Sequence, residues 1–159
     1  MKDIIEILQQ NARISDAELA AMLGITAEEA AARIKDLENK GIIKGYSVIV
    51  NDELYDDSLV YATIELKVTP QRDNGFDDIA KTIMMFEEVE SVSLMSGAYD
   101  LAVEVKGNKL KDVAMFVSDR LSGIEGIVSA STHFILKKYK DHGTVFAQKK
   151  DDEREMFTP

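Results

Sequence analysis

The segment Gly97-Ala98-Tyr99-Asp100 combines groups that together could hold a small molecule. Backbone amides at the turn could bind a carboxylate, the Asp100 carboxylate could meet or orient an ammonium, and the Tyr99 ring could supply a wall. The same residues also suit an ordinary connection between strands, in which glycine supplies an unusual backbone angle and aspartate caps its own turn. Residue chemistry alone favours the ordinary connection.

Few other residues offer reactive or metal-binding chemistry. Cysteine is absent, and His133 and His142 are the only two histidines. Disulfides, a thiol nucleophile and thiolate metal sites are therefore excluded, and a histidine-rich metal site is not expected. We expect no metal and no cofactor. Thr132 and His133, in the predicted last strand, are a second candidate place for a bound effector, although a single histidine there is more often a packed or interface residue.

Two capping boxes position the predicted N-terminal helices. In Ser15-Asp16-Ala17-Glu18 and in Thr26-Ala27-Glu28-Glu29, the first and last residues satisfy each other's free backbone amides. The boxes begin eleven residues apart, which leaves Gly24 and Ile25 as the turn between two helices. This tight spacing is the signature of a helix-turn-helix.

The apolar residues of these helices define a core face and an outer face. The second helix is expected to turn Leu19, Met22 and Leu23 inward, and the third helix Ala30, Ile34 and Leu37. The outer face of the third helix then carries Glu28, Ala31, Ala32 and Lys35. Gly41 ends that helix, and residues 42–46 are expected to form a short strand and turn, the right length for a small wing.

From Leu59 onward the apolar period changes from helical to alternating. Equivalent strand-helix-strand units begin at Val60 and Leu101, about 41 residues apart. Two such units make a ferredoxin-like sandwich, in which both helices lie on one face of an antiparallel sheet. We therefore predict an all-α winged helix-turn-helix over residues 1–46, a linker with a short strand over 47–58, an α+β domain of order βαββαβ over 59–140, and a C-terminal extension over 141–159.

One face of the predicted sheet needs a cover. Tyr61, Thr63, Thr132 and Phe134 are assigned to the face away from the helices, and this set is too mixed for a solvated surface. We expect a second copy of the sheet to pack there, which makes the protein a homodimer at least.

The overall charge limits how the chain could meet nucleic acid. A formal charge of -10 and a pI of about 4.7 argue against non-specific coating of nucleic acid, so any DNA-binding surface must concentrate its positive charge locally. No segment near the N-terminus resembles a signal peptide, and no later stretch approaches the roughly 20 apolar residues that span a bilayer. We expect a cytoplasmic protein without a membrane partner.

Two separate motifs carry a resemblance to a known family. The first is the run Arg13-Ile14-Ser15, Glu18-Leu19-Ala20, Gly24-Ile25-Thr26, Arg33 to Glu38 and Gly41 to Tyr46, and the second is Ser96-Gly97-Ala98-Tyr99-Asp100. Together with the βαββαβ pattern they resemble the Lrp/AsnC, or feast/famine, family of transcriptional regulators. The resemblance implies a dimer built through paired sheets, often assembled into an octamer, an amino acid bound near Gly97 to Asp100, and control of amino-acid metabolism or transport genes. It favours the pocket interpretation of that turn.

The same resemblance implies which residues meet double-stranded DNA. Thr26, Glu28, Ala31, Ala32 and Lys35 would face the major groove, and Arg33, Lys40 and Lys44 would contact phosphates. Relatives usually have serine, threonine or arginine where this chain has Glu28, Glu29, Ala31 and Ala32. A cap explains Glu29 but not Glu28. Because residues 1–45 hold six basic and eight acidic groups, a net charge of -2, we expect weak affinity per half-site that several linked copies make useful.

Two alternatives to a DNA-binding regulator stay open at this point. The three-helix unit could be an interaction module that has lost DNA binding. Certain tetrapyrrole decarboxylases also look like this family, but a porphyrin site has several carboxylates to neutralise, and the second domain offers only Arg72 and Arg120 as arginines. We therefore expect that the protein is not an enzyme.

Overall fold

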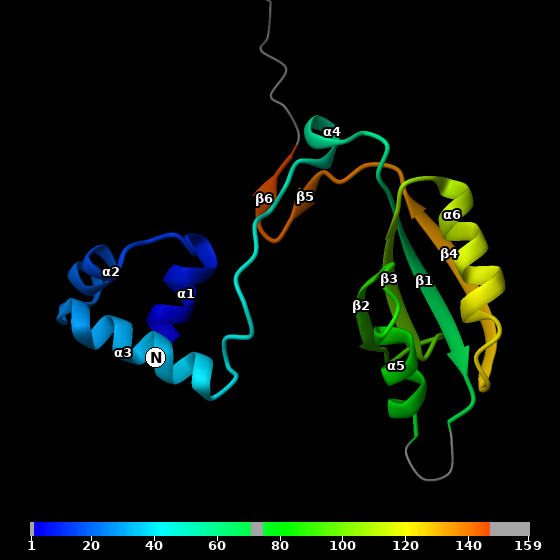
Figure 1. Ribbon diagram of the computed structural model, residues 1–159, viewed down its shortest axis with the longest axis horizontal. Coiled ribbons are helices and arrows are strands. Elements are labelled where there is room, and N and C mark those ends of the chain that lie inside the picture. The colour runs from blue at the N-terminus through cyan, green and yellow to red at the C-terminus, as the bar shows by residue number, and fades with distance from the viewer. Residues whose placement is uncertain (1, 71–74, 147–159) are drawn as a thin grey trace, which may run out of the picture. The chain divides into compact units, whose positions relative to one another are not determined.

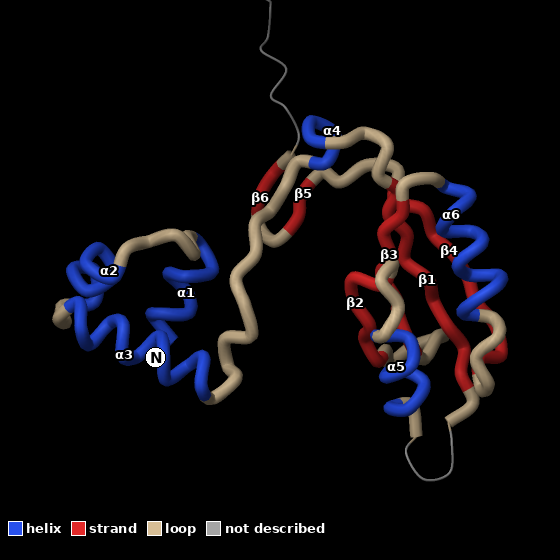
Figure 2. The backbone as a smooth tube through the Cα atoms, viewed as in Figure 1, coloured by secondary structure: helices blue, strands red, loops and turns tan. Residues whose placement is uncertain are grey.

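The computed structural model of the chain describes residues 2–70 and 75–146. It divides into two units, Met1–Ile49 and Val50–Pro159, and each is described by itself below (Figure 1). The first unit is helical and the second is built around a sheet (Figure 2). None of the helices in the described ranges is long and apolar enough to cross a membrane.

Three helices make up the first unit: α1 Lys2–Gln10, α2 Asp16–Leu23 and α3 Ala27–Asn39. Both predicted capping boxes are present, with Ser15 and Thr26 as the N-caps of α2 and α3. Gly24 ends α2 in the left-handed conformation, at a φ of 67°, which a glycine adopts without steric cost. The predicted helix-turn-helix is therefore confirmed, including its tight turn.

Apolar residues from all three helices form the core of this unit. The fully buried side chains are Ile4, Leu19, Ala20, Ala30 and Leu37. Ile34 and Leu23 pack against them and are half-buried. Met22 was expected inside but is 64% exposed, because α2 buries Leu19 and Ala20, packs the half-buried Leu23 against them and leaves position 22 on the flank. The core face of α2 is therefore narrower than its apolar residues suggested.

The strands predicted for residues 42–50 are not formed. After α3 the amides of Ile42 and Ile43 both donate to the Leu37 carbonyl, at 2.9 and 3.2 Å, so the chain folds back onto the helix end. A strand needs a hydrogen-bonded neighbour, and no described residue pairs with this segment. Within the described residues, neither the expected strand of the wing nor the expected short strand of the linker is formed, and the linker contains a single helical turn, α4 Asp52–Tyr55.

The second unit has the predicted order of elements. They are β1 Val60–Val68, α5 Asp77–Met84, β2 Val89–Leu94, β3 Leu101–Gly107, α6 Leu110–Met115 continued by the π-helical η1 Phe116–Leu121, and β4 Ile127–Ile135. The four strands form an antiparallel sheet in the order β2-β3-β1-β4. Both helices contribute to one core with the sheet, on one of its faces (Figure 1). The ferredoxin-like prediction is confirmed.

Strand alternation sets which face of the sheet is buried. Along β1 every second residue from Ala62 to Val68 is buried against the helices, as predicted. The assignment of Thr132 and Phe134 to the opposite face is wrong. They pair with Ile64 and Ala62, so their side chains lie on the helix face. A one-residue error in phase moves every side chain of a strand to the other face, and sequence alone did not fix the phase of β4.

A short hairpin follows β4, which ends at Ile135 rather than near residue 139. Its strands are β5 Lys140–Asp141 and β6 Thr144–Val145. The two loop residues, His142 and Gly143, have positive φ values of 42° and 85°, the backbone that a tight two-residue hairpin turn demands. Most of the predicted C-terminal extension, residues 147–159, lies outside the described residues.

Candidate functional site

A reciprocal pair of hydrogen bonds caps the N-terminus of α3, the predicted DNA-reading helix. The Thr26 hydroxyl accepts from the Glu29 amide at 3.2 Å, and the Glu29 carboxylate accepts from the Thr26 amide at 3.3 Å. The Thr26 hydroxyl predicted to face the groove thus already has a partner in the helix, although the residue remains exposed. Removing the cap would fray the end of the helix that enters the groove in this kind of motif.

The outer face of α3 presents small residues and two cations. Ala31, Ala32 and Lys35 are exposed, as predicted, and Arg33 is exposed as well. Neither Arg33 nor Lys35 forms an ion pair with another described residue. Their charges are therefore available to an anion outside the chain, and the alanines beside them let that anion approach closely.

The other two predicted phosphate ligands lie at the C-terminal end of α3, and of these Lys40 forms an ion pair. The Lys40 ammonium lies 2.6 Å from the Asp36 carboxylate, one helical turn earlier. The Lys44 ammonium lies over Gly41, where a Cβ added to this glycine would come within 2.9 Å of the Lys44 Nζ. A cation is favoured there because the C-terminal end of a helix carries a partial negative charge. An exposed pair such as that of Lys40 is worth only about 0–1 kcal/mol, so this lysine can exchange its partner for a phosphate.

Glu28 has a structural role that the sequence did not suggest. Interactions with its own backbone amide and with the Thr26 hydroxyl lower the pKa of the Glu28 carboxyl. Its negative charge therefore lies at the N-terminal end of α3, where the helix macrodipole favours an anion. The capping box is closed by Glu29 and not by Glu28, as the sequence indicated, and the favourable place of the Glu28 charge at the helix end is the additional finding.

Tyr46 is a residue of the first unit that the sequence analysis did not single out. Its hydroxyl donates to the Glu38 carboxylate at 2.9 Å and ties the segment after α3 to the last turn of the helix. Partial burial and the neighbouring Glu38 carboxylate raise the pKa of Tyr46. A spacing of eight residues between the two partners belongs to no local pattern, so no signal in the sequence predicts this contact.

Asp100 anchors the candidate effector turn to the sheet. Its amide donates to the Leu66 carbonyl at 2.9 Å, one carboxylate oxygen accepts from the Val68 amide at 2.8 Å, and the other lies 3.2 Å from the Lys67 ammonium. The Val68 amide, followed by Lys67, lowers the pKa of the Asp100 carboxyl. Aspartate therefore does cap a turn, but through an amide 32 residues earlier rather than through its own segment.

The rest of the turn leaves its backbone donors open. Gly97 and Ala98 are exposed and Tyr99 is half-buried. Within the described residues, the amides from Ser96 to Tyr99 donate to no acceptor. Gly97 does not have the positive φ that was expected, and a Cβ at this position would meet nothing within 4 Å. Neither backbone angle nor packing within the chain therefore requires glycine at position 97.

The second candidate effector pair does not come together. Thr132 lies on the helix face of β4, whereas His133 lies on the open face. There the His133 Nε2 is 3.2 Å from both the Glu65 carboxylate and the Ser131 hydroxyl. Both neighbours contact the same ring nitrogen, as in a hydrogen-bond cluster on a protein surface. In the described part of the chain, no group of three or more side chains is placed to hold a metal ion.

Comparison with known proteins accounts for both units. Residues 1–44 match the family model of a winged helix-turn-helix DNA-binding domain, and residues 61–145 match that of the Lrp/AsnC ligand binding domain. The chain is 47% identical over 158 residues to YugG, an uncharacterised HTH-type transcriptional regulator of Bacillus subtilis, with 99% of this chain and 95% of that protein covered. It is 30% identical over 139 residues to the HTH-type transcriptional regulator LrpA of Pyrococcus horikoshii, with 87% of this chain and 96% of that protein covered.

Solved structures show the same fold. A transcriptional regulator of Neisseria meningitidis in complex with L-methionine superposes with a TM-score of 0.71 at 25% identity, with 87% of this chain and 89% of that chain covered. An AsnC family transcriptional regulator from Agrobacterium tumefaciens superposes with a TM-score of 0.70 at 20% identity, with 92% and 93% covered. The second likeness concerns the fold alone.

Proposed function

Because the chain belongs to the Lrp/AsnC family of DNA-binding transcriptional regulators, we propose that α3 reads a specific DNA sequence and that an amino acid bound at Gly97 to Asp100 modulates that binding. The relatives are named transcriptional regulators with a helix-turn-helix, which places the chain among regulators rather than enzymes. The target genes proposed are those of amino-acid metabolism or transport.

The DNA half of the proposal rests on the exposed face of α3. Arg33 and Lys35 are exposed cations without an ion-pair partner in the described chain, and they follow the exposed residues Ala31 and Ala32 on α3. Helices of this motif lie in the major groove, where side chains of this face reach base edges and phosphates. We assign phosphate contact to Arg33, Lys40 and Lys44, and base-edge positions to Thr26, Glu28, Ala31, Ala32 and Lys35.

Assembly into an oligomer would compensate for the weak DNA affinity that follows from the acidic composition. The open face of the sheet carries polar and small side chains, among them Thr63, Glu65 and His133, and we propose that a second copy covers it to form a dimer. Higher even assembly, such as an octamer, would link several reading helices. Linked sites raise the effective concentration of each helix at its half-site, which offsets weak single contacts.

The effector half rests on the four open amides from Ser96 to Tyr99. A row of unpaired backbone donors suits the carboxylate of an amino acid. Gly97 lets a ligand approach the backbone closely, since nothing within the chain fills the space beside it. The Neisseria regulator was solved with L-methionine, which supports an amino acid as the class of effector here. Asp100 would orient the turn, because its two carboxylate oxygens are already bonded to Val68 and Lys67.

Fluorescence anisotropy across a salt series tests the DNA half, with DNA from upstream of the chain's own gene. The double variant Arg33→Ala and Lys35→Ala should weaken binding and flatten the salt dependence, since each lost phosphate contact lowers the slope by about one. Lys81→Ala, an exposed lysine of α5, is the control and should leave both unchanged. If the double variant binds like the wild type, α3 is not the reading element, and an interaction module without DNA binding replaces the regulator proposal for this helix.

A thermal-shift screen against the twenty amino acids tests the effector half. A ligand that binds only the folded protein raises the melting temperature by mass action. Gly97→Val should fold and lose this response, because the new side chain fills the approach to the amides. Gly45→Val is a matched control, since Gly45 also has nothing within 4 Å and lacks a positive φ. A response that survives in Gly97→Val would place the effector elsewhere.

A further inference from the structure

The strand β4 forms an edge of the sheet that nothing in the described chain protects. It spans nine residues, Ile127–Ile135, and its outer side has no neighbouring strand in the four-stranded sheet. Its sequence holds no lysine, arginine, carboxylate or proline. Proteins commonly protect an edge with such residues, with a bulge or with a short strand, because unpaired backbone groups recruit a further strand. The register of β4 shifts at its beginning, opposite Lys67 and Val68, so residues 129–135 present a regular open edge.

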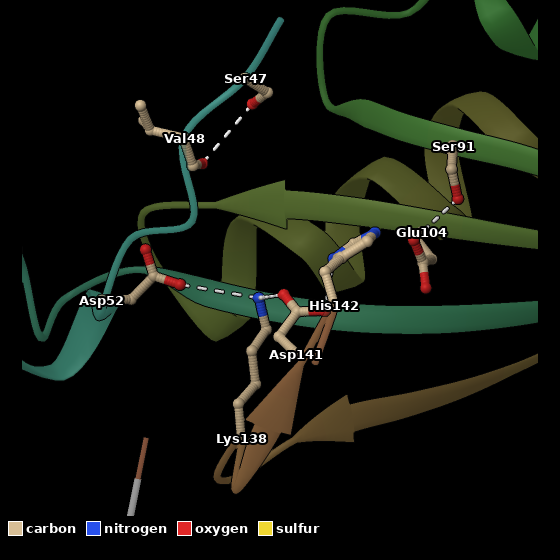
Figure 3. A network of polar contacts seen from close by, with 8 residues as sticks. All are labelled: Ser47, Val48, Asp52, Ser91, Glu104, Lys138, Asp141 and His142. Atoms are coloured by element: carbon tan, nitrogen blue, oxygen red, sulfur yellow. Dashed lines mark hydrogen bonds and ion pairs between the residues drawn. The ribbon is translucent and has the colours of Figure 1, made fainter. Parts of the chain in front are cut away.

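The opposite edge, β2, is protected in the ways that β4 lacks. It spans only six residues, Val89–Leu94. Its register with β3 shifts between Val89 and Ser91, beside Glu90. Ser91 adds a polar contact, since its hydroxyl donates to the Glu104 carboxylate at 2.8 Å (Figure 3). The charge and the shift both hinder the addition of a strand to β2, so a further strand is expected at β4.

The backbone groups of alternate residues in β4 point away from the sheet. In β1, the Leu66 carbonyl accepts from the Asp100 amide at 2.9 Å and therefore faces β3. Because alternate residues of a strand bond to opposite neighbours, Glu65 faces β4, where its partner is Ser131. The residues on either side of Ser131, and every second residue beyond, thus direct their amides and carbonyls outward. In the described chain, the backbone groups left open in this way are those of Ala130, Thr132 and Phe134.

The side chains of these three residues are only partly covered. They lie on the helix face of the sheet, yet Ala130 is exposed and Thr132 and Phe134 are half-buried. Their neighbours on β1, Ile64 and Leu66, are fully buried. The helices therefore cover the centre of the sheet better than its β4 edge. A further strand at this edge would bury apolar surface as well as pair the backbone.

We propose that β4 pairs with β4 of a second copy, antiparallel and centred on Thr132, so that two sheets join edge to edge. In this register Thr132 lies opposite the partner's Thr132, and Ala130 lies opposite the partner's Phe134. Each of these residues exchanges both backbone bonds with its mate, which gives about six hydrogen bonds in the contact. A small side chain meets a large one on the same face, and paired threonines are among the cross-strand pairs that stabilise a sheet.

A second copy fits this edge better than an unrelated peptide. A two-fold axis through Thr132 repeats the match of Ala130 with Phe134, and no carboxylate or lysine within either strand opposes the approach. The contact leaves the open face of the sheet to the dimer proposed above, since that face carries Glu65 and His133. A chain with two self-complementary contacts assembles beyond a dimer, so the inference rests on the higher even assembly already proposed and names its contact.

Disulfide trapping of the full chain tests this register, because the chain has no cysteine of its own. Residues of a hydrogen-bonded antiparallel pair have Cα atoms about 5.5 Å apart, within the range that a disulfide spans. Thr132→Cys oxidised with copper phenanthroline should therefore form a covalent dimer on a non-reducing gel. Ala130→Cys is the matched control, since the two cysteines would lie about 14 Å apart along the paired strands, too far for a disulfide.

Sedimentation velocity tests the contact without a cross-link. We expect the wild type to be larger than a dimer and Ala130→Lys to fall to the mass of a dimer, because a lysine on an edge strand opposes pairing. Thr132→Pro should act in the same way, since it removes an outward amide and leaves the bonds to β1 intact. Ala114→Lys, at an exposed alanine of α6, is the control and should assemble like the wild type.

The outcomes separate this contact from the dimer through the open face. Unchanged assembly of Ala130→Lys, no trapping of Thr132→Cys, or equal trapping of Ala130→Cys would each overturn the edge contact. A dimeric wild type that becomes monomeric in Ala130→Lys would support the edge contact and contradict the dimer through the open face. A monomeric wild type would contradict both. An unchanged melting temperature of Ala130→Lys, whose side chain is exposed, serves as the check on folding.

Discussion

The helix-turn-helix and the sheet unit position their candidate sites over different sequence distances. The N-terminus of α3 is fixed by Thr26 and Glu29, three residues apart, while the effector turn is fixed by contacts of Asp100 with Lys67 and Val68, 33 and 32 residues earlier. Local contacts form with their own helix, whereas the contacts of Asp100 exist only after β1 and the turn have come together. Damage to the first site should therefore stay local, and damage to the second should affect the sheet.

The largest effect is expected from the cores, and it tests whether the units fold separately. Leu37→Ala removes a side chain that is 1% exposed from a core with five buried residues, and should cost about 2–5 kcal/mol. A unit of about 50 residues has little stability to spare, so α1 to α3 should unfold. Ile83→Ala in the larger core should cost a similar amount and leave the sheet folded.

Hydrogen exchange read by mass spectrometry separates these outcomes. In Leu37→Ala, peptides from α1 to α3 should exchange freely, while those from β1 and β3 keep their protection. Simultaneous loss of protection in both units would show that they unfold together, and the comparison between independent units would fail.

The next largest effect is expected at Asp100, the non-local anchor. Asp100→Asn removes the charge that the Val68 amide and the Lys67 ammonium bind, and should lower the free energy of unfolding of the sheet unit. The pKa of this carboxyl is lowered in the folded chain. Its contribution to stability is therefore complete above the ordinary aspartate pKa of about 4, and is lost as the pH falls through the lowered value.

Denaturant unfolding at several pH values checks this prediction. The difference in unfolding free energy between the wild type and Asp100→Asn should be constant from pH 7 to about pH 5 and should shrink below about pH 4. A difference that grows toward low pH would have the wrong sign for a favoured carboxylate. Asp77→Asn, at an exposed aspartate of α5, serves as the matched control.

A smaller and purely local effect is expected from the cap of α3. Thr26→Ala removes the hydroxyl that accepts from the Glu29 amide and should cost the first unit about 1 kcal/mol. For a unit of this size, that corresponds to a fall of about 4–8 °C in its melting temperature. Thr69→Ala, at an exposed threonine of the other unit, should leave the first transition in place. Loss of sheet stability in Thr26→Ala would contradict the local role of the cap.

The smallest effect is expected at Glu28, where two interactions oppose each other. Glu28→Gln should tighten DNA binding by about twofold to fivefold, since one negative charge near the phosphates is removed. The helix should lose a little stability, because its N-terminal end no longer has this anion. Anisotropy and thermal melting of the same variant separate the two effects. Weaker DNA binding in Glu28→Gln would mean that this carboxylate contacts a base, where it can accept from a cytosine amine.

The same contrast explains what the sequence could predict. Capping boxes, the Gly24 turn and the apolar period of the helices are signals within a few residues, and they predicted α2 and α3 closely. Alternation also predicted the βαββαβ order and the buried face of β1. The face of the sheet on which Thr132 lies depends on its pairing with Ile64. This pairing is set by the fold and not by the sequence of β4 alone.

The same difference between local and tertiary contacts applies to the residues of the candidate sites. Exposure of Glu28, Ala31, Ala32 and Lys35 followed from helical periodicity. The ion pair of Lys40 with Asp36 was within reach of the sequence, because such pairs recur one helical turn apart. In contrast, the contacts of Tyr46 with Glu38 and of Asp100 with Val68 join segments that only tertiary structure brings together. No sequence pattern marks them.

The central claim is that an amino acid at Gly97 to Asp100 changes how tightly α3 holds DNA. The most direct measurement is the Kd for upstream DNA, by anisotropy at fixed salt, with and without the amino acid that stabilises the protein. A coupling of about 1–3 kcal/mol between two sites would change this Kd by about 5- to 150-fold. We predict such a change in the wild type and its loss in Gly97→Val, whose Kd without amino acid should equal that of the wild type. An amino acid that stabilises the protein but leaves the Kd for DNA unchanged would contradict the account.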